Sequence, residues 1–261
     1  MPKVFDILKT RWAEVLLLVG FQTGVLFLME QIMTLAEQQA EGKPVHLPQR
    51  IAFLLGLGTM AFIIIWQMLY LGFLRTAYTD GCQRWEPGQL LRIGRLYFWR
   101  MVRFQVLLLV VYSGLAMAGL SVAAAIAKAK TPEDIPLWAV TIVLLAVSLA
   151  LLKPTALSPP IMVARDMMAM RSIRALRQYR LMQEWAIPVI YIGALIFSAA
   201  ASMADETFVP KGTLHYVVMA CHHVIIGIAM LAVHLAALRL VKAGEPPAAA
   251  EAKGASQDKR V

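Results

Sequence analysis

The side chains best suited to binding chemistry are arginines that lie between two long apolar runs. The segment from Arg75 to Arg103 contains six of them. In a helix over residues 87–103, Arg92, Arg95 and Arg103 fall within about 80° of one another, because each residue advances a helix by about 100°. A basic face at a membrane surface attracts anionic headgroups. The pattern predicts a site for an anionic lipid or a phosphate-bearing ligand, and the alternative is that these arginines only fix topology and anchor the helices.

A second basic segment, from Arg165 to Arg180, contains five arginines. Four of them follow one another at a spacing of three residues, which drifts about 60° per step and spreads the charges over half the helix. A clamp on a single ligand is therefore expected only in the first segment. Each segment has one aspartate near its start, Asp80 and Asp166. We expect both to pair with nearby arginines in a structural role, since lone carboxylates rarely catalyse unaided.

The composition indicates a membrane protein. Of 261 residues, 59% are hydrophobic and only 16% are charged, far from the balance of a soluble domain. The net charge of +9 does not indicate nucleic acid binding, because the basic residues flank apolar runs, where they meet anionic lipid headgroups. Cys82 and Cys221 are expected at different levels of the bilayer, as free thiols.

Uncharged runs of about 18 residues or more mark helices that cross the roughly 30 Å hydrocarbon core. They predict an all-α, polytopic bundle over residues 1–242, with two amphipathic basic connector helices on the cytoplasmic side. The six expected spans cover residues 15–36, 51–74, 104–127, 135–157, 185–204 and 212–238. Two successive units of a span, a basic connector and a further span suggest a parallel internal repeat. Residues 243–261 are rich in alanine, proline and charge, and are expected to form a disordered cytoplasmic tail.

Lysine and arginine residues set the expected orientation. Nineteen lie on the side that holds the N-terminus, both arginine segments and the tail, and five lie on the opposite side. Short cytoplasmic connections carry the excess of these residues. Both termini are therefore predicted to be cytoplasmic, in the inner membrane of a bacterium.

Lys153 and the prolines after it distinguish the fourth expected span. An ionisable residue in a span is a functional candidate by default, so Lys153 joins the arginines as a candidate headgroup ligand. It lies about 27 Å along a helix that begins at residue 135, near the cytoplasmic boundary, where its ammonium can instead reach water. Pro154, Pro159 and Pro160 are predicted to break or kink the helix and to free carbonyl groups that line a cavity.

Four histidines lie in the last expected span, at positions 215, 222, 223 and 234. A haem between two helices needs axial histidines on both, and the other five expected spans contain none. We therefore expect interhelical hydrogen bonds to polar residues such as Gln67 or Tyr112. The fifteen methionines are expected to fill gaps in apolar packing. No cofactor, metal site or catalytic pair is predicted, and we expect no enzymatic activity.

One stretch of the chain resembles a known group of proteins. An apolar, proline-containing approach over residues 157–163 leads to Asp166 and then to a helix that contains Ser172. This order resembles the pattern before the fifth span in a large set of uncharacterised six-span bacterial membrane proteins, which includes the membrane domain attached to some glycerophosphodiester phosphodiesterases. Residues 81–103 fit the same scheme. The resemblance implies a helical bundle without a catalytic domain, since no phosphodiesterase sequence follows residue 242.

These features favour a non-enzymatic inner-membrane protein that binds or moves a lipid-like or small amphipathic ligand. Its partners would be membrane lipids, with their anionic headgroups held by the arginines. The alternative is a structural or assembly subunit of a larger membrane complex, because small residues at 114–119 and 198–202 permit close helix approach. The complex-subunit hypothesis predicts membrane-protein partners. Neither hypothesis predicts a nucleic acid partner.

Overall fold

A computed structural model describes residues 3–40, 49–128, 131, 135–178, 189–190, 192–193 and 213–243. Seven helices have their bounds within these ranges, and no described residue lies in a strand, which confirms the predicted all-α class for this part of the chain. The helices are α1 (Val4–Thr10), α2 (Trp12–Ala40), α3 (Gln49–Thr79), α4 (Pro87–Ala127), α5 (Leu137–Arg165), α6 (Ala169–Gln178) and α8 (Thr213–Ala243).

Five of these helices are long and apolar enough to cross a membrane. The qualifying stretches are Trp12–Met29, Leu54–Thr79, Pro87–Ala127, Trp138–Arg165 and Val217–Ala243. They correspond to the first four and the last of the six predicted spans. The other predicted span, residues 185–204, lies outside the described residues except at four positions, and the predicted tail lies outside them after residue 243.

The first arginine segment is not the separate connector helix that its sequence predicts. α3 continues to Thr79, the chain turns at Gly81 with a φ of 64°, and α4 then runs from Pro87 to Ala127 without interruption. Proline suits the first turn of a helix, where its missing N–H would have no partner in any case. No later proline interrupts the 41 residues of α4, so the arginines lie on the first part of a helix that continues into the membrane.

The second basic segment does contain a short helix of its own, α6, which follows a tight turn. The turn places Asp166 in the left-handed region, with a φ of 54°, a conformation that aspartate adopts more readily than most residues. On α6, Ser172 and Leu176 are buried, whereas Arg171 and Arg174 are exposed. The residues that follow α6, 179–188, lie outside the described part of the chain, so the internal repeat stays a prediction.

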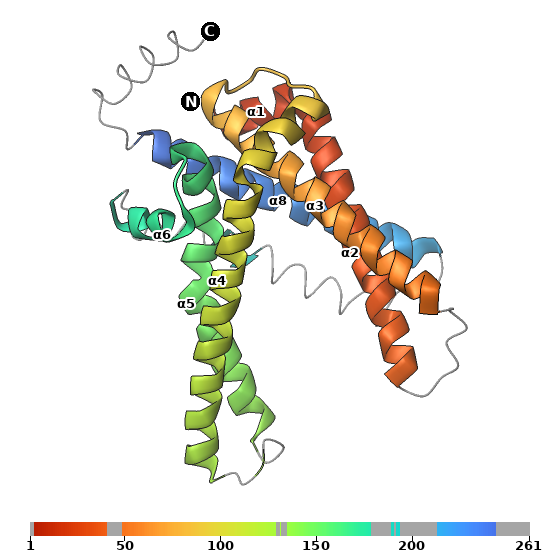
Figure 1. Cartoon of the computed structure of the whole chain (residues 1–261), viewed down its shortest axis with the longest axis vertical. Helices are drawn as coiled ribbons and strands as arrows, with labels where there is room; N and C mark the ends of the chain where they lie inside the picture. The colour runs from red at the N-terminus through yellow and green to blue at the C-terminus, as the bar shows by residue number, and fades with distance from the viewer. Residues whose placement is uncertain are drawn as a thin grey trace.

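The arginine segments and the N-terminus meet at one end of the helices (Figure 1). We call this the basic end, and it comprises α1, residues 75–103, residues 161–178 and the last turn of α8. Arg84 Nε donates a hydrogen bond to the Thr10 carbonyl oxygen at 2.8 Å. Lys242 Nζ donates to the Tyr78 carbonyl oxygen at 3.0 Å. Away from the basic end, the α4–α5 pair diverges from α2 and α3 (Figure 1).

Two glycines bring α3 and α4 into backbone contact near the basic end. A Cβ atom added to Gly94 would lie 1.7 Å from the Met68 carbonyl oxygen, and one added to Gly72 would lie 2.0 Å from the Leu90 carbonyl oxygen. Helices approach this closely only where no side chain intervenes. This crossing holds the first part of α4 against the end of α3.

α5 continues past the prolines at which the sequence predicts a break or a kink. The helix runs to Arg165 through Pro154, Pro159 and Pro160, so none of them ends it. Each internal proline removes a backbone hydrogen bond, but neighbouring helices can satisfy the freed groups and keep the helix intact. Residues 156–164 are all buried, so α5 has neighbours on every side at the point where its own hydrogen bonding is weakest.

Candidate functional site

Three of the predicted headgroup ligands lie together on the exposed side of α4. Arg92, Arg95 and Arg103 are all exposed, and none of them makes an ion pair, hydrogen bond or ring contact with any described residue. Leu96 and Trp99 lie on the same side of the helix and are 71% and 67% exposed. We call these five residues the arginine face. Three guanidinium groups that bind no described residue therefore share a surface with two large apolar side chains.

The neighbouring arginines of the segment hold the basic end together. Arg75 Nη1 donates hydrogen bonds to the carbonyl oxygens of Val163 and Ala164, both at 2.9 Å. These are among the last carbonyls of α5, which have no partner within their own helix. Arg100 forms an ion pair with Asp166, the residue that ends α5. Arg75 and Arg100 therefore tie α3 and α4 to the end of α5.

The two aspartates that the sequence assigned to structural pairing have different surroundings. Asp166 is in the ion pair with Arg100. Asp80 is exposed in the turn between α3 and α4, where its carboxylate accepts a hydrogen bond from Thr79 Oγ1 at 2.7 Å. Asp80 makes no ion pair with any residue that the structure describes, so only Asp166 links the basic segments.

A buried ion pair, which the sequence did not reveal, joins the N-terminus to the basic end. Arg11 is completely buried between α1 and α2, and its guanidinium pairs with Glu14. Arg11 Nη2 also donates to Thr76 Oγ1 at 2.8 Å, and the guanidinium carbon lies 4.3 Å from the centre of the Phe73 ring. Glu14 Oε1 accepts a hydrogen bond from the backbone N–H of Trp85 at 3.0 Å.

The charge count had placed Arg11 among the surface residues that set orientation. A signal for the pairing was present, because Arg11 and Glu14 are three residues apart and residues at this spacing are neighbours on a helix. No comparable sequence pattern predicts that Arg11 is buried, since its contacts around the pair, Thr76 and Trp85, come from distant parts of the sequence. The pair therefore fixes α1 and α2 to α3 and to the turn before α4.

Lys153, the fourth predicted headgroup ligand, lies within α5 and not at its end. Because α5 continues to Arg165, twelve helical residues follow Lys153, or about 18 Å of helix. Its side chain is only 7% exposed. Arg92, Arg95 and Arg103 are exposed whereas Lys153 is buried, so the four predicted ligands do not share one exposed surface.

A buried histidine links α8 to α3. His234 of α8 hydrogen-bonds to the hydroxyl of Tyr70 in α3, and the two rings also meet edge to face with their centres 5.6 Å apart. The sequence predicted interhelical hydrogen bonds of this kind, but with other partners.

The remaining metal-ligating side chains form no cluster in the described residues. The rings of His222 and His223 stack with their centres 5.2 Å apart, and the His215 side chain lies outside the described part. Across the residues that the structure describes, no group of three or more histidine, cysteine or acidic side chains is placed to hold a metal ion. Cys82 and Cys221 are free thiols, as the sequence predicted.

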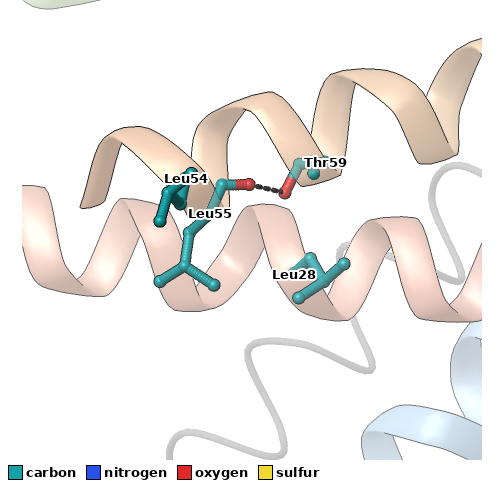
Figure 2. Close-up of a pocket in the computed structure, with 5 residues that line it drawn as sticks. Leu28, Leu54, Leu55 and Thr59 are labelled. Carbon is teal, nitrogen blue, oxygen red and sulfur yellow. Dashed lines mark hydrogen bonds between the residues drawn. The ribbon is translucent and has the colours of Figure 1, made fainter. Parts of the chain in front are cut away.

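A pocket of about 240 Å³ lies between α2 and α3 (Figure 2). It is lined by Leu28, Leu54, Leu55, Gly58 and Thr59. The Thr59 hydroxyl donates a hydrogen bond to the Leu55 carbonyl of its own helix at 2.8 Å, the dashed line in Figure 2. With this hydroxyl occupied and leucines around it, the pocket offers a ligand apolar contact but little polar recognition.

The five apolar helices of spanning length define this chain as a helical integral membrane protein. Comparisons with protein-family models, with curated proteins and with solved structures find no match. The class therefore follows from the residues and the fold, and the resemblance to six-span bacterial membrane proteins stays a prediction.

Proposed function

We propose that this protein binds anionic phospholipid headgroups at the cytoplasmic surface of a bacterial inner membrane, through the arginine face of α4. One observation carries the proposal. Half of the arginines between residues 75 and 103 bind other groups of the protein, whereas the other half are exposed, lie on one face and have no partner among the described residues. Trp99 lies among them, and amphipathic rings of this type settle at the headgroup level of a bilayer.

The length of α4 supports this placement. Its 41 residues extend about 60 Å, whereas a bilayer with its headgroup layers measures roughly 40–45 Å. Residues 103–127 alone cover about 36 Å, enough to cross a hydrocarbon core of roughly 30 Å in a tilted helix. The arginine face then begins at the headgroup layer with Arg103 and extends outward to Arg92. The excess of basic residues at this end supports a cytoplasmic location for it.

A single headgroup is too small to contact the whole arginine face. Arg92 and Arg103 are eleven residues apart, which is about 16 Å along the helix. Basic residues near an anionic surface contribute separately, at about 1 kcal/mol each in typical polybasic segments. The protein is therefore expected to gather several anionic headgroups, and this replaces the single-ligand clamp that the spacing first suggested.

Replacing two arginines of the face tests lipid binding. Wild-type protein and an R92A/R95A variant would be extracted from vesicles of phosphatidylglycerol and phosphatidylcholine, and the retained lipids would be counted by native mass spectrometry. We expect the variant to retain roughly tenfold less phosphatidylglycerol, because two cations are lost from the headgroup surface. Retention of phosphatidylcholine should not change.

The matched control is an R171A/R174A variant, which removes the same charge from exposed arginines of α6. We expect this variant to keep most of its phosphatidylglycerol, because the proposal assigns headgroup binding to α4, where Arg103, Leu96 and Trp99 lie on the same exposed face as Arg92 and Arg95. Equal losses in the two variants would show that total charge attracts the lipid and that the arginine face has no special role. Wild-type protein without bound phosphatidylglycerol would contradict lipid binding altogether.

A subunit of a larger membrane complex is the second candidate. Gly114 and Ala118 are exposed four residues apart on α4, and a Cβ atom added to Gly114 would meet nothing within 4 Å. Small residues at this spacing let another helix approach closely. Purification in a mild detergent separates the candidates, since a partner protein in fixed proportion favours the complex and protein that elutes alone with bound phosphatidylglycerol favours lipid binding. The other small-residue segment, residues 198–202, lies outside the described residues.

A further inference from the structure

We propose that a crevice between α4 and α5 binds a neutral amphipathic lipid, one with an ester or carbonyl group next to an apolar chain. The crevice has a volume of about 410 Å³, within the range of roughly 300–1,000 Å³ that is usual for small-molecule sites. Four leucines line it together with four polar side chains, Gln105, Tyr112, Ser148 and Thr155. The arginine face lies on the other side of α4, so this site does not depend on headgroup binding there.

The polar side chains of the crevice lie at two levels. Gln105 and Tyr112 are seven residues apart on α4, and Ser148 and Thr155 are seven residues apart on α5. Because the two helices run antiparallel (Figure 1), Gln105 and Thr155 form an outer level near the basic end, and Tyr112 and Ser148 form an inner level. Seven residues correspond to about 10 Å of helix. The leucines of the crevice lie between and beside these levels.

Three of the four polar groups are not used by the described protein. Neither the Gln105 amide nor the hydroxyls of Tyr112 and Ser148 hydrogen-bond to any described residue. By contrast, Thr155 Oγ1 donates to the Leu151 carbonyl of its own helix at 2.7 Å. Polar groups at membrane depth cost free energy unless they are hydrogen-bonded. A ligand with hydrogen-bonding groups in the crevice would satisfy them.

The lining also determines the chemical class of the ligand. None of the described residues that line the crevice is charged, so a carboxylate or phosphate would enter without a counter-ion, which is costly inside a membrane. Hydroxyl and amide groups bond readily to neutral ester, carbonyl and hydroxyl groups, and the leucines accommodate an apolar chain. A second pocket between the same helices, of about 500 Å³, has no hydroxyl or carboxamide in its described lining. The polar recognition therefore belongs to the crevice near the basic end.

A photoactivatable neutral lipid tests this site. Full-length protein in phosphatidylcholine vesicles would be irradiated with monooleoylglycerol that has a diazirine in its acyl chain, and the labelled residues would be located by mass spectrometry. We expect labels within residues 105–112 and 148–155. A Y112F/S148A variant removes two hydroxyls and keeps the apolar shape. Its labelling there should fall roughly fivefold, because each lost hydrogen bond weakens binding a few-fold.

The matched control is S113A, because Ser113 is exposed on α4 and its hydroxyl does not line the crevice. Its labelling should equal that of wild-type protein. Excess unlabelled monooleoylglycerol should displace the probe, whereas excess oleate, which is charged, should not. Labels spread evenly over the spanning helices, equal labelling of Y112F/S148A and S113A, or displacement by oleate would each overturn the proposal. The R92A/R95A variant should be labelled normally, so the two proposals can fail separately.

Discussion

Replacing Gly94 with alanine is expected to lower the free energy of unfolding by about 3 kcal/mol. The new Cβ atom would lie 1.7 Å from the Met68 carbonyl oxygen and 3.0 Å from the Gly72 backbone nitrogen. These are backbone atoms, which cannot rotate away as a side chain can. α3 and α4 would have to separate, at a cost near the upper end of that for overpacked cores. Unfolding of the protein in detergent micelles, by heat or by added SDS, measures the loss.

Gly114 provides the control for this change, because it receives the same substitution in the same helix. A Cβ atom at Gly114 would meet nothing within 4 Å, and alanine favours a helix over glycine by about 1 kcal/mol. The Gly114→Ala variant should therefore be as stable as wild-type protein or slightly more stable. Similar unfolding of the two variants would mean that α3 and α4 do not cross as closely as Gly72 and Gly94 indicate.

Removing the carboxylate of the buried ion pair is expected to be at least as damaging. In a Glu14→Ala variant, the Arg11 guanidinium would stay completely buried without its anionic partner, and the Trp85 N–H would lose its acceptor. Loss of one partner of a buried pair typically costs about 3–5 kcal/mol. The same unfolding assay should show a loss in this range.

A double variant separates the effect of charge from that of packing. R11M/E14M removes both charges and leaves two flexible apolar side chains that fill most of the space. Replacing both members of a buried pair by apolar residues is often neutral or stabilising, so this variant should recover most of the stability that Glu14→Ala loses. If the double variant is as unstable as Glu14→Ala, an uncompensated charge is not the cause.

The apolar runs were sufficient to predict most of the fold. A long run without charged residues has few alternatives to a spanning helix, because its backbone groups must find hydrogen bonds within the segment. The bias of basic residues placed both arginine segments on one side, and the structure has them at one end. The exposed face of α4 was also predictable, because the spacing of Arg92, Arg95 and Arg103 defines one side of a helix whatever its length.

The features that the sequence did not reveal depend on contacts between distant residues. After Arg103 the sequence changes from arginine-rich to uncharged, but the helix continues. The prediction of a separate connector helix and a span beginning at residue 104 was therefore wrong. Gly72 and Gly94 have no special signal until α3 and α4 cross. The prolines of α5 predicted a break or a kink, and the helix continues past them where the helices around it bury residues 156–164. Tyr112 and Ser148 share a crevice only because α4 and α5 are antiparallel.

The decisive measurement is the position of the arginine face relative to the lipid headgroups. Leu96 is exposed within that face, so a Leu96→Cys variant, with Cys82 and Cys221 replaced by serine, would take a fluorophore there. Its quenching by a phospholipid with a nitroxide on the headgroup would be measured in vesicles that contain phosphatidylglycerol. Lipid binding predicts strong quenching that falls when Arg92 and Arg95 are also replaced by alanine. Weak quenching that does not depend on these arginines would contradict lipid binding and favour a protein partner.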